Sequence, residues 1–569
     1  MTSTEPSLWR SLFLAIVMAM QLGVPANAQS LEEQFSHWPV NLTIHGRILI
    51  DNGVQDWDDL MPVLERVTKD QSVVCFQREA AGSSKRLTDA LNATVGDNGS
   101  IEATSFTAMP LDELKSALSS ADVVVIQAGE DRASDLPTLL KLKPHLDQFL
   151  AEGRTLVVDQ AIATLLGKAV LSKTLPTGND AGLNLFPDSI LLCDFDENGE
   201  SQADLLKAVT GHPRTVGIGI QRGVMLMLSG RKVTCYGSGR TTFVLAGRDK
   251  GLPRIETLSP AATRRQTPQE ALLDLTEWRR DAIDRTLEPF PPEQTETPFV
   301  ENGTLVIVGG GGLPPGLMSR FVELAGGKEN ARLVYVPCAE ELEVNQDQEI
   351  VRNWKKLGVE QATLIHTKNR RLANSDEEFL APLKDATGIW FGGGRQWNLA
   401  DSYYGTKAHQ MMKEVLQRGG VVGGSSAGAS IQARYLARAT PIGKFNIMAP
   451  GYERGGLGFI GGVAIDQHFT QRKRHKDLTQ LINRYPQLLG IGLDEMTAIV
   501  VQKSKAEVVG NGKVFFYDSQ RPVIGDEPDY VALPNGSSYD LAKRAVLVDT
   551  TGVPVDKESE PKIEKSNIQ

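Results

Sequence analysis

The chain has 569 residues, of which 41% are hydrophobic and 23% charged, and its formal net charge is −10. This length exceeds what one hydrophobic core serves, so we predict two to four globular domains of ordinary soluble composition. The acidic balance argues against a nucleic-acid-binding protein. The spacing of Cys75, Cys193, Cys235 and Cys338 matches neither a metal-binding nor a disulfide-rich pattern.

The N-terminus carries the pattern of a secretory signal peptide. Arg10 precedes an apolar run over residues 11–20, and an A-x-A cleavage site follows at residues 26–28. Because the apolar run is short for a bilayer span, a cleaved leader over residues 1–28 is favoured over a membrane anchor. We predict a soluble mature protein that begins at Gln29, is secreted or periplasmic, and has no membrane partner after cleavage.

Apolar runs alternate with helix-like segments from residue 46 onwards. Strands are expected at 46–53, 72–76, 122–126 and 154–158, and helices near 57–67, 111–119, 136–152 and 268–286. Strands that read as continuous apolar runs are typical of a parallel sheet covered on both faces. The sequence therefore predicts an α/β domain over residues 29–287, followed by a Pro-rich linker over residues 288–300.

The same order of elements begins again after the linker. The matching segments, first and second copy, are 46–53 with 303–310, 72–76 with 331–336, 123–129 with 388–394, 182–185 with 456–459, 217–220 with 490–493, and 233–239 with 508–514. Similar segments that recur in one order predict two tandem domains, the second over residues 301–548. Residues 549–569 are charged and poor in apolar side chains, so we predict a disordered tail.

The segment Gly424–Gly428 fits the nucleophile-elbow pattern G-x-S-x-G, with Ser426 on a predicted strand-to-helix turn. Small neighbours let the backbone bend there, and the helix N-terminus offers free N–H groups to an oxyanion. Taken alone, the same residues also describe a Gly-rich turn that only packs tightly, because short motifs recur by chance.

Two further polar segments follow predicted strands in the second copy. One contains His468 after the strand at 463–465, and the other contains Glu495 after the run at 490–493. A serine hydroxyl needs a base to accept its proton, and an imidazole base works best when a carboxylate orients it. Strand ends of α/β sheets meet at one edge, so Ser426, His468 and Glu495 are candidates for a catalytic triad.

These segments resemble cyanophycinase and the related peptidase E-like serine peptidases, over roughly residues 303–518. The resemblance rests on residues 391–396, 424–429, 466–474 and 490–495. It implies a class-I-glutamine-amidotransferase-like α/β fold, which the tandem pattern extends to both copies. It also implies that Ser426 is the nucleophile, His468 the general base and acid, and Glu495 the orienting carboxylate.

The resemblance further implies an oxyanion hole and a substrate pocket, and neither a metal nor another cofactor. The oxyanion hole would use backbone N–H groups of Gly393, Gly394 and Ala427. The pocket would be lined by Gln396, Asp466, Gln467, Arg472 and Arg474. The family cleaves cyanophycin, a polyaspartate that carries arginine on its side chains, to β-Asp-Arg dipeptides, so the expected partner is a peptide or polymer substrate.

Two residues depart from the family pattern and change the charge of this pocket. Asp477 stands where the family usually has a third arginine, and Arg395 stands where an acidic residue is common. Another isoaspartyl or short acidic peptide is therefore an alternative substrate. An esterase or amidase with the same triad, and a binding protein with a vestigial site, are further alternatives.

The first copy lacks the candidate catalytic side chains. Alignment on the shared glycines places Gln160, Asp194 and Arg222 opposite Ser426, His468 and Glu495. We therefore predict an inactive copy that is retained for structure, for substrate binding or for pairing with the second domain. Related enzymes form homodimers, so an intramolecular pair of the two copies or a homodimer is expected.

Overall fold

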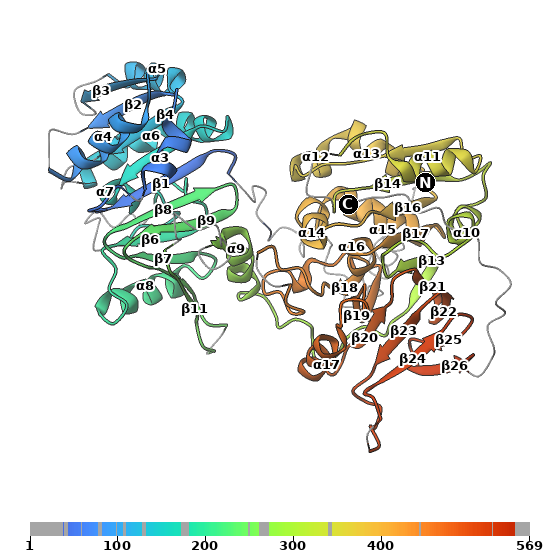
Figure 1. Ribbon diagram of the computed structural model, residues 1–569. Coiled ribbons are helices and arrows are strands. Elements are labelled where there is room, and N and C mark those ends of the chain that lie inside the picture. The colour runs from blue at the N-terminus through green and yellow to red at the C-terminus, as the bar shows by residue number, and fades with distance from the viewer. Residues whose placement is uncertain are drawn as a thin grey trace, which may run out of the picture.

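The computed structural model describes residue 38 and residues 44–58, 60–77, 82–97, 99–105, 110–127, 132–171, 181–248, 251–260, 272–339, 344–442, 445–525 and 527–551. The predicted signal peptide and most of the predicted tail lie outside these residues. The chain forms two α/β lobes, which we call the N-terminal half and the C-terminal half (Figure 1). Among the described residues, no helix combines the length and the apolar character needed to cross a bilayer.

The N-terminal half begins with β1 and ends with α9. Its strands are β1 (Arg47–Asn52), β2 (Ser72–Gln77), β3 (Ser100–Ser105), β4 (Val123–Gln127), β5 (Thr155–Asp159), β6 (Ser189–Cys193), β7 (Val216–Ile220), β8 (Val224–Ser229), β9 (Lys232–Gly237), β10 (Thr241–Leu245), β11 (Arg254–Leu258) and β12 (Leu272–Asp274). Its helices are α3 (Met61–Thr68), α4 (Gly82–Thr94), α5 (Leu111–Ser120), α6 (Arg132–Ala151), α7 (Gln160–Ala163), α8 (Glu200–Gly211) and α9 (Leu275–Asp284).

The C-terminal half begins with β13. Its strands are β13 (Val300–Val308), β14 (Arg332–Val336), β15 (Gln361–Leu364), β16 (Gly388–Phe391), β17 (Val421–Ser425), β18 (Ala433–Tyr435), β19 (Ile460–Asp466), β20 (Leu489–Leu493), β21 (Thr497–Lys503), β22 (Lys505–Gly510), β23 (Lys513–Tyr517), β24 (Tyr530–Pro534), β25 (Ser538–Asp540) and β26 (Ala545–Val548). Its helices are α10 (Leu317–Leu324), α11 (Glu349–Lys356), α12 (Arg370–Ser375), α13 (Glu377–Lys384), α14 (Gln396–Tyr403), α15 (Lys407–Gln417), α16 (Ala427–Ser430), the short 3-10 helix η1 (Glu453–Gly455) and α17 (His475–Arg484).

The two halves share one strand order. The larger sheet runs β3-β2-β4-β5-β1-β8-β9-β12 in the N-terminal half and β15-β14-β16-β17-β13-β21-β22-β25-β26 in the C-terminal half. In each sheet the first five strands pair in parallel and the later ones are antiparallel. The predicted α/β class with helix-flanked sheets is confirmed.

Each half also has a second, smaller sheet that the sequence patterns did not predict. It runs β11-β10-β7-β6 in the N-terminal half and β18-β19-β20-β23-β24 in the C-terminal half. Because β19 and β20 belong to this second sheet, their ends approach the end of β17 from a different layer. The candidate residues after β17, β19 and β20 therefore meet where the two sheets of one half adjoin.

The helix expected at 268–286 is shorter than predicted. Residues 272–274 instead form β12, which pairs with β9, and residues 261–271 lie outside the described part of the chain. The helix α9 starts at Leu275 because the Asp274 side chain accepts a hydrogen bond from the backbone N–H of Glu277. Every residue of α9 is buried.

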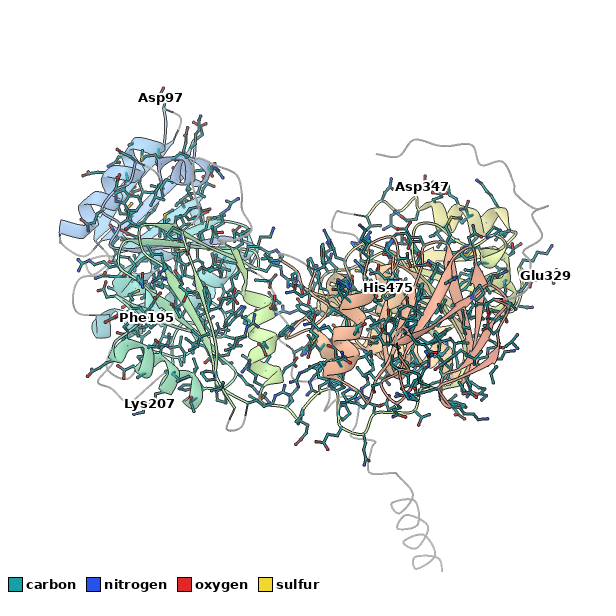
Figure 2. All side chains as sticks on the ribbon, turned by 60° about the horizontal axis from the view of Figure 1, so that its bottom comes forward. Asp97, Phe195, Lys207, Glu329, Asp347 and His475 are labelled. Atoms are coloured by element: carbon teal, nitrogen blue, oxygen red, sulfur yellow. The ribbon has the colours of Figure 1, made fainter. Side chains whose placement is uncertain are left out.

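The buried helix α9 lies between the two lobes. Figure 1 and Figure 2 both show it on the side of the N-terminal half that faces the C-terminal half, and Figure 2 places Phe195 in the first lobe and His475 in the second. Gly451 of the C-terminal half packs against the α9 backbone, since a Cβ atom there would lie 2.6 Å from the carbonyl oxygen of Glu277. A surface helix would be polar on one face, so the complete burial of α9 reflects contact with both halves.

Candidate active site

Ser426 sits on a sharp turn between β17 and the short helix α16. Its backbone has φ 56° and ψ −114°, a conformation that residues other than glycine rarely adopt. The backbone N–H of Ser426 donates to the carbonyl of Val308 at 3.0 Å, which ties the turn to β13. Such a strained strand-to-helix turn is what the elbow motif predicts for an exposed nucleophile.

The glycines of the motif are required by close backbone packing. A Cβ atom on Gly424 would lie 2.3 Å from the carbonyl oxygen of Gly428. A Cβ atom on Gly428 would lie 2.2 Å from the carbonyl oxygen of Phe391, at the end of the neighbouring strand β16. The two glycines thus let α16 turn back directly over the strand ends, and the local sequence explains the elbow.

The structure brings Ser426, His468 and Glu495 together in one hydrogen-bonded chain. Ser426 Oγ lies 2.8 Å from His468 Nε2, and His468 Nδ1 lies 2.6 Å from Glu495 Oε1. An ionised carboxylate can only accept a hydrogen bond, so Nδ1 carries the imidazole proton and Nε2 is free to accept the serine proton. This is the arrangement in which a neutral histidine activates a serine hydroxyl.

Burial keeps the imidazole in its neutral form. His468 is 8% exposed, and burial lowers its pKa below the usual value of 6.5, although the hydrogen bond to Glu495 raises it. The positive charges of Arg472 and Arg474 lower the pKa further. At neutral pH the imidazole is therefore ready to take a proton, as a general base must be.

A run of four glycines after β13 makes room for the imidazole and its carboxylate. A Cβ atom on Gly310 would lie 2.3 Å from His468 Cε1, and one on Gly311 would lie 2.6 Å from Glu495 Cδ. The backbone N–H of His468 donates to the carbonyl of Gly309 at 2.8 Å. The role of residues 309–312 was missed in the sequence analysis, although consecutive glycines at the end of a strand are a signal that could have revealed it.

The turn expected to supply the oxyanion hole lies beside Ser426. A Cβ atom on Gly393 would lie 3.7 Å from Ser426 Cβ, and Gly394 has φ +115°. Ala427 follows Ser426 directly as the first residue of α16. The three predicted residues are therefore close to the serine, and Gly394 adopts a backbone conformation that favours glycine.

Four of the five predicted pocket residues are buried and already bound by other protein groups. Gln396 Nε2 donates to the carbonyls of Ala437 and Arg438 at 3.1 and 2.6 Å. Arg474 Nη1 donates to Asp466 Oδ1 at 2.9 Å and to the backbone and side-chain oxygens of Gln467 at 2.6 and 3.2 Å. Asp466 was expected to line the substrate pocket, and in the structure protein arginines occupy its carboxylate.

Arg438 is the second arginine on Asp466, and the sequence analysis missed it. Its Nε and Nη2 donate to the two Asp466 oxygens at 3.1 and 2.7 Å, and Asp466 is fully buried. Nη2 also donates to Asp477 at 2.9 Å. The acidic residue that departs from the family pattern thus has a partner in this chain. An isolated arginine without a recurring pattern offered no signal for this role.

Two arginines with solvent exposure are close in sequence to residues of the candidate site. Arg472 is exposed, and its backbone N–H donates to the carbonyl of His468 at 3.0 Å. Arg395 directly follows Gly394, and its guanidinium carbon lies 4.2 Å from the centroid of the Phe445 ring. Of the predicted pocket residues, Arg472 alone is exposed to solvent, and Arg395 is partly exposed.

Residues in corresponding places of the N-terminal half lack this chemistry. Gln160 directly follows β5 as Ser426 follows β17, and Arg222 lies two residues beyond β7 as Glu495 lies two residues beyond β20. Asp194 shares the left-handed backbone of His468, with φ 53° against 48°. The aromatic side chains after these two residues, Phe195 and Phe469, cover Gly219 and Gly492 respectively.

The part of the chain that contains this site is similar to known peptidases. Residues 298–509 match the model of peptidase family S51. The matched residues lie in the C-terminal half of this chain. Cyanophycinase of Geminocystis herdmanii is 29% identical over 206 residues, which are 36% of this chain and 75% of that protein. Cyanophycinase of Trichormus variabilis is 26% identical over 280 residues, which are 46% of this chain and 92% of that protein.

Two solved structures of peptidases are similar to part of this chain. A peptidase from an acI-B1 Actinobacterium is 25% identical, covers 43% of this chain and 98% of its own, and has a TM-score of 0.31. A putative peptidase E protein from Listeria monocytogenes is 15% identical, covers 34% of this chain and 98% of its own, and has a TM-score of 0.27. The family match and the curated relatives support a peptidase, and hence a hydrolase.

Proposed function

We propose that the C-terminal half is a serine peptidase that hydrolyses cyanophycin or a related β-aspartyl peptide. The observation that carries this proposal is the hydrogen-bonded chain Ser426–His468–Glu495, which lies within the residues that match the model of peptidase family S51. The names of the curated relatives support the substrate class. The triad and the substrate are our inference from this geometry and these relatives.

The reaction follows from the roles of the three side chains. Ser426 Oγ attacks the substrate carbonyl while His468 Nε2 takes the hydroxyl proton, and Glu495 stabilises the imidazolium that forms. N–H groups of Ala427 and of the Gly393–Gly394 turn would receive the oxyanion. The C–N bond then breaks as His468 returns the proton to the leaving amine, which leaves an acyl-enzyme. A water molecule, deprotonated by His468, releases the acid and restores the serine.

Fluorophosphonate labelling tests whether the site is catalytic. We expect covalent labelling of the wild type at Ser426, loss of labelling in Ser426→Ala, and unchanged labelling in the matched control Ser425→Ala. In His468→Ala the labelling rate should fall by about 100-fold or more, because general-base catalysis contributes about 10²–10⁴-fold. Absence of labelling in a folded wild type would favour a binding protein with a vestigial site.

A substrate panel then separates the remaining alternatives. We expect release of β-Asp-Arg from purified cyanophycin by the wild type and not by Ser426→Ala. Cleavage of short isoaspartyl or acidic peptides without cyanophycin cleavage would instead point to the exopeptidase or amidase alternative, with Arg395 and Asp477 as the residues that changed the pocket. Hydrolysis of simple esters alone would make the protein an esterase.

We also propose that the N-terminal half is inactive and that the mature protein is exported. Gln160, Asp194 and Arg222 provide no nucleophile with an adjacent base, which supports the first statement. The signal-peptide pattern over residues 1–28 supports the second. N-terminal sequencing of the protein from its native host should find Gln29 as the first residue. A mature chain that starts at Met1 and stays in the cell extract would contradict export.

A further inference from the structure

Asp401 of the C-terminal half lies between two arginines of the N-terminal half. Arg280 Nη1 lies 2.5 Å from Asp401 Oδ1, and Arg231 Nη1 lies 2.6 Å from Asp401 Oδ2. Arg280 comes from α9 and is fully buried, while Arg231 comes from the turn between β8 and β9. The Tyr452 hydroxyl adds a hydrogen bond to Asp401 Oδ1 at 3.0 Å. Each carboxylate oxygen of Asp401 thus forms an ion pair with an arginine of the other half.

Aromatic rings fix the positions of both guanidinium groups. The guanidinium carbon of Arg280 lies 3.4 Å from the centroid of the Trp38 ring and 4.6 Å from that of Tyr452. Arg231 lies 4.3 Å from the ring of Trp397, which is on the same helix as Asp401. A flat guanidinium stacks on aromatic faces better than an ammonium group does. The contact between the halves therefore favours arginine over lysine at these positions.

The helix that carries Asp401 also shapes the candidate active site. Helix α14 begins at Gln396, and only Arg395 separates it from the Gly393–Gly394 turn that lies beside Ser426. Gln396 donates to the carbonyls of Ala437 and Arg438, and Arg438 in turn binds Asp466, two residues before His468. A shift of α14 would therefore move the predicted oxyanion turn and disturb the support of the imidazole.

We propose that the inactive N-terminal half positions the active site of the C-terminal half through Arg280 and Arg231, which hold α14 by Asp401. This inference rests on the proposed function, since it concerns the geometry around the nucleophile Ser426. Buried ion pairs contribute little net stability but disfavour alternative arrangements, because separating the two partners leaves uncompensated charges buried away from water. The N-terminal half thus acts as a built-in positioning partner of the enzyme.

The test compares two neighbouring buried arginines of α9. Arg280→Met removes the contact with Asp401, whereas Arg279→Met, the matched control, removes an ion pair with Asp188 inside the N-terminal half, at 2.6 Å. The rate constant of fluorophosphonate inactivation at saturation should fall about 10- to 100-fold in Arg280→Met, since a misplacement of about 1 Å can reduce a rate about 100-fold. The probe concentration at half-saturation, and both parameters of Arg279→Met, should stay unchanged.

Three further measurements separate positioning from a general loss of structure. Arg280→Lys keeps the charge and should restore part of the rate. Asp401→Asn should lower the labelling rate. The double variant Arg280→Met/Asp401→Asn should be labelled only slightly more slowly than Asp401→Asn, because both substitutions remove the same contact. Amide hydrogen exchange of residues 392–396 should increase in Arg280→Met and not in Arg279→Met.

The outcomes distinguish this inference from the proposed function. Folded Arg280→Met protein that is labelled at the wild-type rate, with unchanged exchange at residues 392–396, would overturn the positioning role. A wild type that is never labelled would overturn the proposed function instead. In that case the exchange measurement alone still decides whether the N-terminal half holds α14, since it needs no catalysis.

Discussion

Gly310 lies directly against the imidazole of His468, at a distance that leaves no space for a side chain. A Cβ atom at this position would lie 2.3 Å from Cε1 and 2.5 Å from Nε2, the atom that faces Ser426 Oγ. Gly310→Ala must therefore displace the imidazole and break the contact with the serine. We expect the fluorophosphonate labelling rate to fall by about 100-fold.

The N-terminal half supplies the control for this substitution. Gly53 occupies the corresponding place after β1 and also has positive φ, +72° against +96° for Gly310. A Cβ atom on Gly53 would meet Arg222 at an ordinary contact distance of 3.4 Å. Gly53→Ala should thus lower the free energy of unfolding by about 1 kcal/mol, because alanine disfavours a positive φ, and should leave the labelling rate unchanged. Equal labelling rates in Gly310→Ala and wild type would contradict the proposed role of His468.

The labelling rate should depend on the protonation of His468. Because burial lowers its pKa below 6.5, the neutral base persists into mildly acidic solution, and the rate should reach half its maximum below pH 6.5. Arg472→Ala removes a positive charge that lowers this pKa, so the midpoint should move to higher pH. The control Lys476→Ala, an exposed cation on α17, should leave the midpoint in place. A midpoint that moves to lower pH in Arg472→Ala would contradict this account.

Asp466 should contribute to stability rather than bind substrate. Asp466→Asn leaves Arg438 and Arg474 buried without their shared carboxylate, and removal of one member of a buried ion pair costs about 3–5 kcal/mol. Asp477→Asn is the control, because it removes a partner of the same Arg438 whose side chain is 45% exposed. It should lower the free energy of unfolding by less than about 1 kcal/mol. Chemical denaturation measures both. Full stability of Asp466→Asn with a raised KM would return Asp466 to the substrate pocket.

Asp284, at the end of α9, should make stability depend on pH. Burial raises its pKa from 3.8 to about 7, although Arg454 of the C-terminal half lowers it. A carboxyl whose folded pKa is raised stabilises the fold below its unfolded pKa and loses this contribution as pH rises through the folded value. Between pH 4 and 7 the wild type should therefore lose stability relative to Asp284→Asn, on the order of 1–4 kcal/mol.

Thermal unfolding of the two proteins over this pH range measures the effect. The melting temperature of the wild type minus that of Asp284→Asn should fall as the pH rises from 4 to 7. Glu256→Gln is a suitable control, because Glu256 is an exposed carboxylate of the N-terminal half with 51% of its side chain accessible. If the melting temperatures of wild type and Asp284→Asn differ by the same amount at every pH, Asp284 is ionised in the folded protein.

Local patterns were sufficient for several strands and for the turn that carries Ser426. The apolar runs predicted β1, β2, β4 and β5 within a residue or two at each end, and the motif around Ser426 predicted its turn, because packing at Gly424 and Gly428 admits no side chain. Residues at strand ends in two similar copies indicated which histidine and which carboxylate to consider. These features depend on neighbours in the chain, and a sequence displays them directly.

The sequence by itself thus determined the α/β class, the repeated order of elements, and three residues that could form a catalytic chain. The tertiary structure alone decided that those three lie within hydrogen-bonding distance, that Asp466 is closed off by Arg438 and Arg474, and that Arg280 of one half holds Asp401 of the other. The physical reason is that a charged side chain takes the partner that folding brings near it. Asp466 and Arg438 are 28 residues apart in the sequence, and Arg231 and Asp401 belong to different halves of the chain.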